Sequence, residues 1–341
     1  MEDIEQIKEV LFEHGYEYKQ FLGQGGFSSV YLCQSCKYHH DFAIKRTIIS
    51  KLTKEEYNTL VSLNHPNIIK IYDAFEKDNV LYLVIEYCPN GTIKKNEQLH
   101  YDQFVYYARQ ILNAISYCHS QKIAHRDIKP ENIFYDQFEN CKLADFGIAK
   151  HFNTINDKSD QKCGSIKYFA PEMFQQQEVY PFKADIWALG ITFFYMATGY
   201  YPFRGESRKE LKKSIMFGEI DFSKCKIDSR IRYLIFKMTN MNPKMRPSAE
   251  KLLKLPMFSS LLDDKKLSHA LGINHRKSFP QEYHRRMHIT PHKSLTFHTD
   301  LSDSSNNDAA PLTKLHTFKS SSISPLMQRI SCHFKPVNDN M

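Results

Sequence analysis

The feature that most constrains the fold is a change of hydrophobic pattern near residue 88. Over residues 18–87, short runs rich in β-branched and aromatic residues follow one another, including SSVYLCQS, DFAIKRTI and VLYLVIEY. Such runs are typical of strands, and only residues 54–63 among them suggest a helix. From 88 to 258 the pattern becomes helical. Strands followed by helices predict an α+β chain with a small β-rich lobe and a larger, mostly helical lobe.

Two long stretches in the second block predict different kinds of helix. Residues 101–120 carry apolar side chains at helical spacing, among them Phe104 and Ile111, which predicts a helix with one buried face. Residues 185–199 are apolar nearly all round, which predicts a helix at the centre of the lobe. Shorter helices are predicted at 230–239 and, after a Pro-Ser pair, near 248–255.

The two ends of the chain differ from these blocks. Residues 1–17 are interpreted as an N-terminal extension, and their acidic, amphipathic start does not resemble a secretory signal. Residues 259–341 are rich in serine, histidine and asparagine and poor in apolar residues. They cannot bury a core of their own, so we predict that most of this tail is disordered.

Charge and cysteine usage limit the classes of function. The net charge is +8, but the basic residues are scattered, so we expect no nucleic-acid partner. No run approaches 18 consecutive apolar residues, so we expect no membrane span. The eight cysteines lie within apolar patterns, which favours reduced thiols and a cytoplasmic location, with access to the nucleus left open. Cys33 and Cys36 have a zinc-like spacing, but no second ligand pair follows them.

Residues 23–30 (GQGGFSSV) place glycines between two predicted strands. Because glycine has no side chain, backbone amides at Gly23, Gly25 and Gly26 can approach phosphate oxygens. A glycine turn in an ordinary hairpin carries the same pattern. A dinucleotide-binding fold is disfavoured because it needs a helix after the glycines. Here a second strand follows, and then Lys45 on a third.

This order of strand, glycine loop, strand and lysine resembles the N-lobe of the protein kinases, with Ser28 in place of the third glycine. The sequence HRDIKPEN at 125–132 matches the catalytic loop of that family position by position. DFG at 145–147 and APE at 170–172 follow in the order of the family. The resemblance covers about residues 18–258. It is strongest to the calcium/calmodulin-dependent and AMP-activated group of eukaryotic-type serine/threonine kinases.

The resemblance implies Mg²⁺-dependent transfer of the γ-phosphate of ATP to serine or threonine hydroxyls of protein substrates. Asp127 is implied as the base that accepts the proton of the substrate hydroxyl. Lys45 is implied to hold the α- and β-phosphates, and Glu56 to orient that lysine, with Glu55 as the other register. Lys129 is implied to steady the γ-phosphate.

The resemblance also implies the groups that bind the cofactors. Asn132, counted with the catalytic residues, and Asp145 offer hard oxygen ligands suited to Mg²⁺, with Mn²⁺ as a substitute. ATP is expected in the cleft between the lobes. The residues implied to bind it are Leu22, Gly23, Gly25, Gly26, Val30, Ala43, Lys45, Glu86, Cys88, Phe134 and Asp145.

Further contacts are implied around the catalytic loop. Ser165 takes the place of a threonine that packs on the catalytic aspartate in the family. Glu172 is expected to pair with Arg246. Asp185 and Trp187, on the apolar helix, are expected to brace the catalytic loop from below.

The resemblance raises a hypothesis about regulation. Arg126 precedes the catalytic aspartate, where the family often has an arginine that pairs with a phosphate on the activation segment. That segment, residues 145–172, contains Thr154 and Ser159. We hypothesise that an upstream kinase, or the chain itself, phosphorylates one of them and raises activity.

The sequence leaves the substrate preference and two rival functions open. Many members of the group carry a glutamate where this chain has Thr92 and use it to hold a basic substrate residue. Glu131 is retained, so a preference for arginine-containing substrates is undecided. The first rival is a pseudokinase that binds nucleotide and acts as a scaffold. The second, a kinase of small molecules, is disfavoured because the segment closed by APE is typical of kinases with protein substrates.

Overall fold

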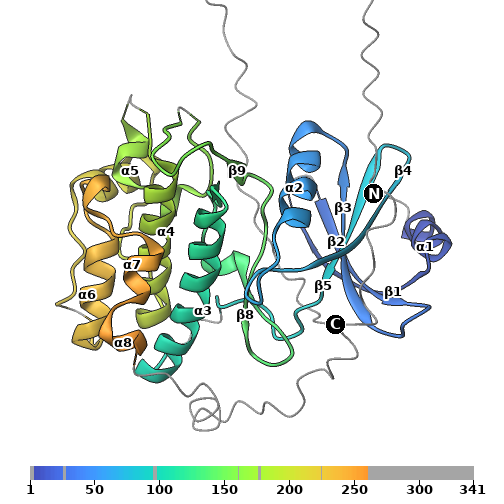
Figure 1. Cartoon of the computed structure of the whole chain (residues 1–341), viewed down its shortest axis with the longest axis horizontal. Coiled ribbons are helices and arrows are strands. Elements are labelled where there is room, and N and C mark those ends of the chain that lie inside the picture. Colours follow the sequence, from blue (N-terminus) through green and yellow to red (C-terminus); the bar gives the residue numbers. More distant parts are fainter. Residues whose placement is uncertain are drawn as a thin grey trace, which may run out of the picture.

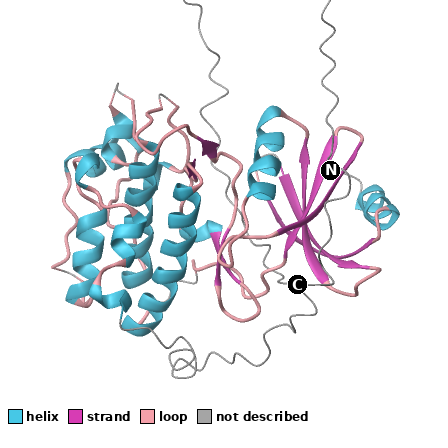
Figure 2. Cartoon of the chain, viewed as in Figure 1, coloured by secondary structure: helices cyan, strands magenta, loops and turns pink. Residues whose placement is uncertain are grey.

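The computed structural model describes residues 4–25, 28–94, 98–159, 161–175, 178–223 and 225–259. They form two lobes that lie side by side, with most of the strands in one and the long helices of the chain's second half in the other (Figures 1 and 2). The predicted α+β architecture is therefore confirmed. The tail from residue 260 onward, for which disorder was predicted, lies outside the described residues.

The smaller lobe is built on a five-stranded antiparallel sheet with the order β1-β2-β3-β5-β4. The strand-like runs SSVYLCQS, DFAIKRTI and VLYLVIEY of the sequence form three of its strands. Its register places Lys45 between Val30 on one side and Leu83 on the other, which sets the direction of the lysine side chain. The strands are β1 (Tyr16–Gln24), β2 (Ser28–Ser35), β3 (Asp41–Ile48), β4 (Ile71–Lys77) and β5 (Val80–Glu86).

Helix α2 (Lys51–Ser62) lies beside this sheet, on the side nearer the larger lobe (Figure 1). It begins three residues before the predicted start because Ser50 and Thr53 form a capping box. The Ser50 hydroxyl accepts a hydrogen bond from the Thr53 backbone amide at 3.2 Å, and the Thr53 hydroxyl accepts one from the Ser50 amide at 2.8 Å. A capping box usually has glutamate or glutamine at the third helical position, and this helix has Thr53 there. The sequence pattern therefore did not predict this cap. Glu56 is buried on the inner face of the helix.

Helix α1 (Ile4–Glu13) shows that part of the expected N-terminal extension belongs to the small lobe. Its apolar residues Ile7, Val10 and Leu11 are buried in one cluster with side chains of the sheet. Strand β1 begins at Tyr16, two residues before the start predicted from its pattern. The amphipathic character seen in the sequence is therefore used for packing against the sheet. The proposed division of the chain at 17, 87 and 258 stays a prediction.

The larger lobe is organised around α4, of which 15 of 18 residues are buried, as its apolar sequence predicts. Phe104 of α3 packs edge-on against Phe193 of α4 at 5.5 Å. Helix α4 ends at Gly199, whose φ of 77° is the left-handed conformation that glycine adopts without strain. The helices are α3 (Tyr101–Ser120), α4 (Pro181–Thr198), α5 (Arg208–Phe217), α6 (Ser229–Met238), α7 (Ala249–Leu253) and α8 (Pro256–Ser259).

Short elements near the boundary between the lobes carry the catalytic loop and the activation segment. They form two small antiparallel pairs, β6 with β9 and β7 with β8, and three 3₁₀ turns. Two to four residues are too few for a periodic pattern, so the sequence did not predict them. The elements are β6 (Ile123–Ala124), η1 (Pro130–Asn132), β7 (Ile133–Tyr135), β8 (Cys141–Leu143), β9 (Lys150–His151), η2 (Ile166–Tyr168) and η3 (Pro171–Phe174).

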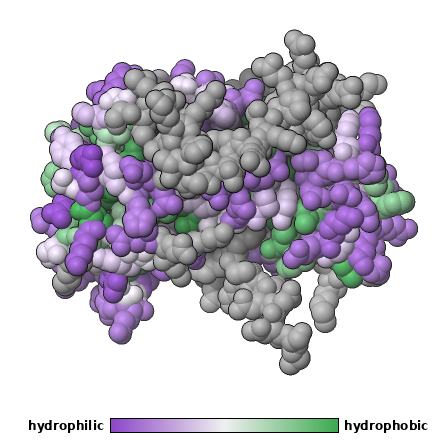
Figure 3. All heavy atoms as spheres, turned by 90° about the horizontal axis from the view of Figure 1, so that it is seen from below, coloured by the Kyte–Doolittle hydropathy of each residue, from purple (hydrophilic) through white to green (hydrophobic). Residues whose placement is uncertain are grey.

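Polar side chains cover most of the described surface seen in Figure 3, with smaller hydrophobic patches over both lobes. Within the described ranges, no helix combines the length and the apolar character that crossing a membrane requires.

Candidate active site

The catalytic loop at 125–132 is fastened to the core of the larger lobe by Asp185 of α4. One carboxylate oxygen accepts the backbone amide of His125 at 2.9 Å, and the other accepts that of Arg126 at 2.8 Å. Arg126 has a φ of 71°, an uncommon conformation for a residue with a long side chain. The two hydrogen bonds hold the loop in this conformation, so the bracing role predicted for Asp185 is confirmed.

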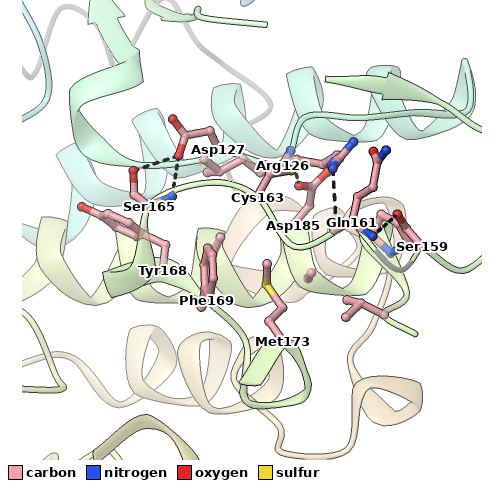
Figure 4. Close-up of a pocket in the computed structure, with 15 residues that line it drawn as sticks. Arg126, Asp127, Ser159, Gln161, Cys163, Ser165, Tyr168, Phe169, Met173 and Asp185 are labelled. Carbon is pink, nitrogen blue, oxygen red and sulfur yellow. Dashed lines mark hydrogen bonds between the residues drawn. The ribbon is translucent and has the colours of Figure 1, made fainter. Parts of the chain in front are cut away.

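Asp127 lies at the centre of a dense set of polar contacts. Lys129 donates from Nζ to one carboxylate oxygen of Asp127 at 2.6 Å, and Asn132 donates from Nδ2 to the same oxygen at 3.2 Å. Ser165 donates to the other oxygen from its amide and its hydroxyl, both at 3.0 Å (Figure 4). These four donors fix the orientation of the carboxylate. The predicted contact of Ser165 with Asp127 is therefore present.

Gly164 allows the activation segment to lie directly against the catalytic loop. Its φ is 105°, and a Cβ atom at this position would lie 2.5 Å from the backbone oxygen of Arg126. Any other residue would force the two segments apart. Because Ser165 follows directly, its contact with Asp127 depends on this glycine.

Lys45 connects three segments of the chain. Its Nζ atom lies 2.7 Å from Glu56 Oε1 of α2 and 3.5 Å from Asp145 Oδ1. The side chains of Lys45 and Glu56 are only 16% and 5% exposed. Glu56 is thus the partner of the lysine, and Glu55, the other register, is not: it is placed near Lys51 instead.

Burial and charge act in opposite directions on this cluster. Burial favours a lower pKa for Lys45, but the carboxylates of Glu56 and Asp145 raise its pKa above the ordinary value. Burial favours a higher pKa for Asp145, yet the ammonium groups of Lys45 and Lys129 lower it. Lysine and aspartate are therefore both charged at neutral pH, as a site for an anion and a cation requires.

A cavity of about 300 Å³ opens beside these charges, between the sheet and the larger lobe. Gly23 is not among its lining residues: it lies in β1 opposite Val30. Gly26 lies outside the described residues. The predicted residues that do line the cavity are Leu22, Gly25, Val30, Ala43, Lys45, Glu56, Glu86, Cys88, Asn132, Phe134 and Asp145.

Apolar residues that the sequence analysis did not single out complete this cavity. Part of its wall is formed by Leu60 of α2, by Ile69, which precedes β4, and by Leu83 of β5. Leu83 lies in a run that the sequence predicts as a strand. Its position opposite Lys45 follows from the pairing of β3 with β5. The site thus combines an apolar wall with charged groups at one end.

The donor set beside the cavity suits a hard cation. Both hydrogen bonds that Asn132 donates to Asp127 use Nδ2, so its amide oxygen takes no part in holding Asp127. Asp145 adds an ionised carboxylate, and oxygen ligands of this kind are those that Mg²⁺ prefers. By contrast, Cys33 is buried while Cys36 is exposed, and no cluster of three or more His, Cys, Asp or Glu side chains in the described part of the chain is placed to hold a metal.

A second, smaller cavity runs along the activation segment next to the catalytic loop (Figure 4). Asp127 and Ser165 border it on one side, and Phe169 and Met173 add apolar surface.

The activation segment is anchored at its end by a buried ion pair, as predicted. Arg246 donates to both carboxylate oxygens of Glu172 at 2.6 and 2.8 Å, and the two side chains are 0% and 5% exposed. The guanidinium lies over the ring of Trp187 at 4.9 Å, and that ring stacks on Phe203. Trp187 therefore supports this ion pair; the contacts that hold the loop come from Asp185.

The protein kinase domain family matches residues 16–258 of the chain. The chain belongs to this family. Similar proteins include calcium-dependent protein kinase 6 of Plasmodium berghei, which is 35% identical over 72% of this chain and 17% of that protein. Maternal embryonic leucine zipper kinase of Xenopus tropicalis is 34% identical over 71% and 38%, and CBL-interacting serine/threonine-protein kinase 15 of Arabidopsis thaliana is 31% identical over 73% and 62%.

The family that the motifs predicted is thus confirmed, and the group suggested by their wording is consistent with these relatives. The matched region of the kinase domain spans 17% to 62% of the length of the three relatives.

Proposed function

We propose that this kinase domain transfers the γ-phosphate of ATP to serine or threonine hydroxyls of protein substrates. The observation that carries the proposal is that Lys45 and Asp145 line one cavity, while Asn132, which lines it too, donates a hydrogen bond to Asp127 beside it. Relatives with serine/threonine kinase names support the same activity.

ATP is proposed to occupy the larger cavity. Its adenine would pack on Val30, Ala43 and Phe134, next to the backbone of Glu86 and Cys88. Lys45, held by Glu56, would bind the α- and β-phosphates, and the loop with Gly23, Gly25 and Gly26 would cover them.

Asn132 and Asp145 are proposed to hold Mg²⁺, with Mn²⁺ as a substitute. When bound, the cation offsets the negative charge of the phosphate oxygens. Because the amide nitrogen of Asn132 is bound to Asp127, the same residue would connect the metal site with the base.

Asp127 is proposed to accept the proton of the substrate hydroxyl. The hydroxyl oxygen forms a bond to the γ-phosphorus while the bond from that phosphorus to the β–γ bridging oxygen breaks, which leaves ADP. An ionised carboxylate has about four lone-pair sites, and the donors from Lys129, Asn132 and Ser165 already occupy them. The substrate therefore has to displace one of them, and the uncharged hydroxyl of Ser165 is the weakest competitor. Lys129 would steady the transferred phosphate.

Regulation by phosphorylation is proposed at Thr154 in preference to Ser159. Thr154 is exposed, and its hydroxyl donates to Asp157 at 2.6 Å. Ser159 is buried, its backbone pairs with Val179, and its hydroxyl accepts the amide of Gln161. An upstream kinase or the chain itself would reach Thr154 without opening the segment.

A cytoplasmic location, with access to the nucleus left open, is proposed from the cysteines. All seven cysteines of the described residues are unpaired, which fits a compartment that keeps thiols reduced.

The test of the proposed function is phosphate transfer from radiolabelled ATP to a generic protein substrate. We expect incorporation of label by the wild type and almost none by Asp145→Asn. ATP binding without transfer by the wild type would favour the nucleotide-binding scaffold instead. Label found on small molecules and on no protein would favour the third class of function.

A further inference from the structure

A line of polar contacts runs from Glu131 of the catalytic loop to Tyr168 and Tyr201, on the side of the site where we propose that the protein substrate binds. Glu131, in η1, has one carboxylate oxygen 2.9 Å from Nζ of Lys94 and the other 3.2 Å from the hydroxyl of Tyr168. The hydroxyls of Tyr168 and Tyr201 are 2.9 Å apart, and the ammonium of Lys167 lies 4.9 Å from the centre of the Tyr201 ring. Lys94 and Lys167 are thus connected through the side chains of Glu131, Tyr168 and Tyr201.

This line of contacts lies close to Asp127, the proposed base. Glu131 directly precedes Asn132, which donates to Asp127, and Tyr168 lines the same cavity as Asp127 (Figure 4). A substrate hydroxyl that reaches Asp127 brings its neighbouring residues to Tyr168 and Glu131.

The charges along the line favour an anionic substrate. Burial would raise the pKa of Glu131, but the hydrogen bond from Lys94 lowers it, so this carboxylate is ionised and already paired. The side chain of Lys94 is 48% exposed, and Lys167 is exposed as well. Thr92, which pairs with the strand at Phe134, adds no charge. The cations face solvent, while the carboxylate is occupied.

We propose that this face selects serine or threonine acceptors flanked by acidic side chains. An acidic substrate residue can approach Lys94 or Lys167 without breaking a contact. A basic substrate residue would have to displace Lys94 from Glu131 and leave two cations side by side. The proposal names the substrate class of the proposed kinase activity and so rests on it.

The experiment compares peptides of equal length with one serine acceptor and neutral, acidic or basic flanks. We expect the acidic peptides to have a KM roughly three- to fivefold below that of the neutral ones, with kcat little changed, because exposed charge pairs contribute modestly. The basic peptides should have the highest KM. Raising the salt concentration should shrink the difference, since exposed charges are screened.

Two variants shift this preference in opposite directions. Lys94→Ala removes a cation and exposes the carboxylate of Glu131, so the KM of acidic peptides should rise about threefold and that of basic peptides should fall. Glu131→Gln releases Lys94 and should strengthen the preference for acidic peptides. The matched control is Lys254→Ala, which breaks an exposed lysine–glutamate pair on α7, with Glu250 at 2.6 Å, and should not move the preference.

Each outcome is decisive. A wild type that prefers basic peptides, or a preference that Lys94→Ala leaves unchanged, overturns the inference while the proposed kinase activity stands. A preference for acidic peptides that is lost equally in Lys254→Ala also overturns it, because the effect would then come from net charge alone. Phosphate transfer to no peptide and to no generic protein overturns the proposed function, and this inference with it.

Discussion

Two lysine–glutamate pairs flank the site, one on the side proposed for the nucleotide and one on the side proposed for the protein substrate. Lys45 and Glu56 are 2.7 Å apart, and Lys94 and Glu131 are 2.9 Å apart. The charges and distances are nearly the same, but the exposed fractions are 16% and 5% in the first pair and 48% and 23% in the second. Burial, and not the pairing itself, is the main difference between them.

This difference sets what each pair can do. A buried pair is costly to break, because the remaining charge is left without water. An exposed pair contributes little to stability and exchanges partners readily. The Lys45–Glu56 pair therefore suits the proposed role of holding one invariant ligand, the nucleotide. The Lys94–Glu131 pair leaves its cation exposed, where a substrate side chain can reach it.

The largest expected effect comes from a change at Asp127, the proposed base. Asp127→Asn removes the proton acceptor and should lower kcat roughly 10²- to 10⁴-fold. Nucleotide affinity should change little, since Asp127 does not line the larger cavity. Steady-state kinetics and titration with ATP measure the two quantities. Full activity in this variant would contradict the proposed base.

A third pair checks whether burial decides the cost of breaking an ion pair. Glu172→Gln leaves the buried guanidinium of Arg246 without its charged partner and should lower the free energy of unfolding by about 3 to 5 kcal/mol. Chemical denaturation followed by circular dichroism measures this change. Glu250→Gln, which breaks the exposed pair with Lys254, serves as the control and should cost less than about 1 kcal/mol. Equal losses in both variants would refute the role given to burial.

Breaking the buried pair beside the nucleotide should affect catalysis more than folding. Glu56→Gln leaves Lys45 with Asp145 as its remaining charged partner and should lower kcat/KM for ATP roughly 100-fold. The lysine is then drawn toward the carboxylate that we propose to hold the metal. Glu55→Gln, the neighbouring exposed residue, is the matched control and should leave the kinetics unchanged. A loss in the control equal to that of Glu56→Gln would argue against orientation of Lys45 by Glu56.

The smallest expected effect is a pH dependence of the exposed pair. The pKa of Glu131 is lowered from its ordinary value of 4.5, so the stability that it contributes is present above that pH and is lost as the pH falls through the lowered pKa. The difference in unfolding free energy between the wild type and Glu131→Gln should be under about 1 kcal/mol near pH 7 and should shrink below pH 4.5. Denaturation curves at several pH values measure it. A difference that grows on acidification would have the wrong sign.

The sequence predicted most of what is encoded locally. Short runs with β-branched residues became the five strands, and the 20-residue helix α3 has the predicted bounds. The residues of the proposed site could be named because family motifs keep them in fixed order. Lys45 could be named from its place after the glycine loop, and Glu56 as its partner from the resemblance to the family.

What the sequence could not predict depends on contacts between distant segments. Lys94, Glu131, Tyr168 and Tyr201 are separated by more than 30 residues from one to the next, and no periodicity links them. The packing of α1 was missed for a related reason. Its amphipathic pattern shows that one face is buried, but not which surface buries it.

The attachment of the catalytic loop to Asp185 has a consequence for inactivation by heat. Helix α4 is the buried centre of the larger lobe, so the loop that carries Asp127, the proposed base, cannot be displaced without disturbing that core. The small lobe can loosen, for example by detachment of α1, and still leave this anchor intact. Thermal loss of phosphate transfer is therefore expected to be reversible as long as the larger lobe stays folded.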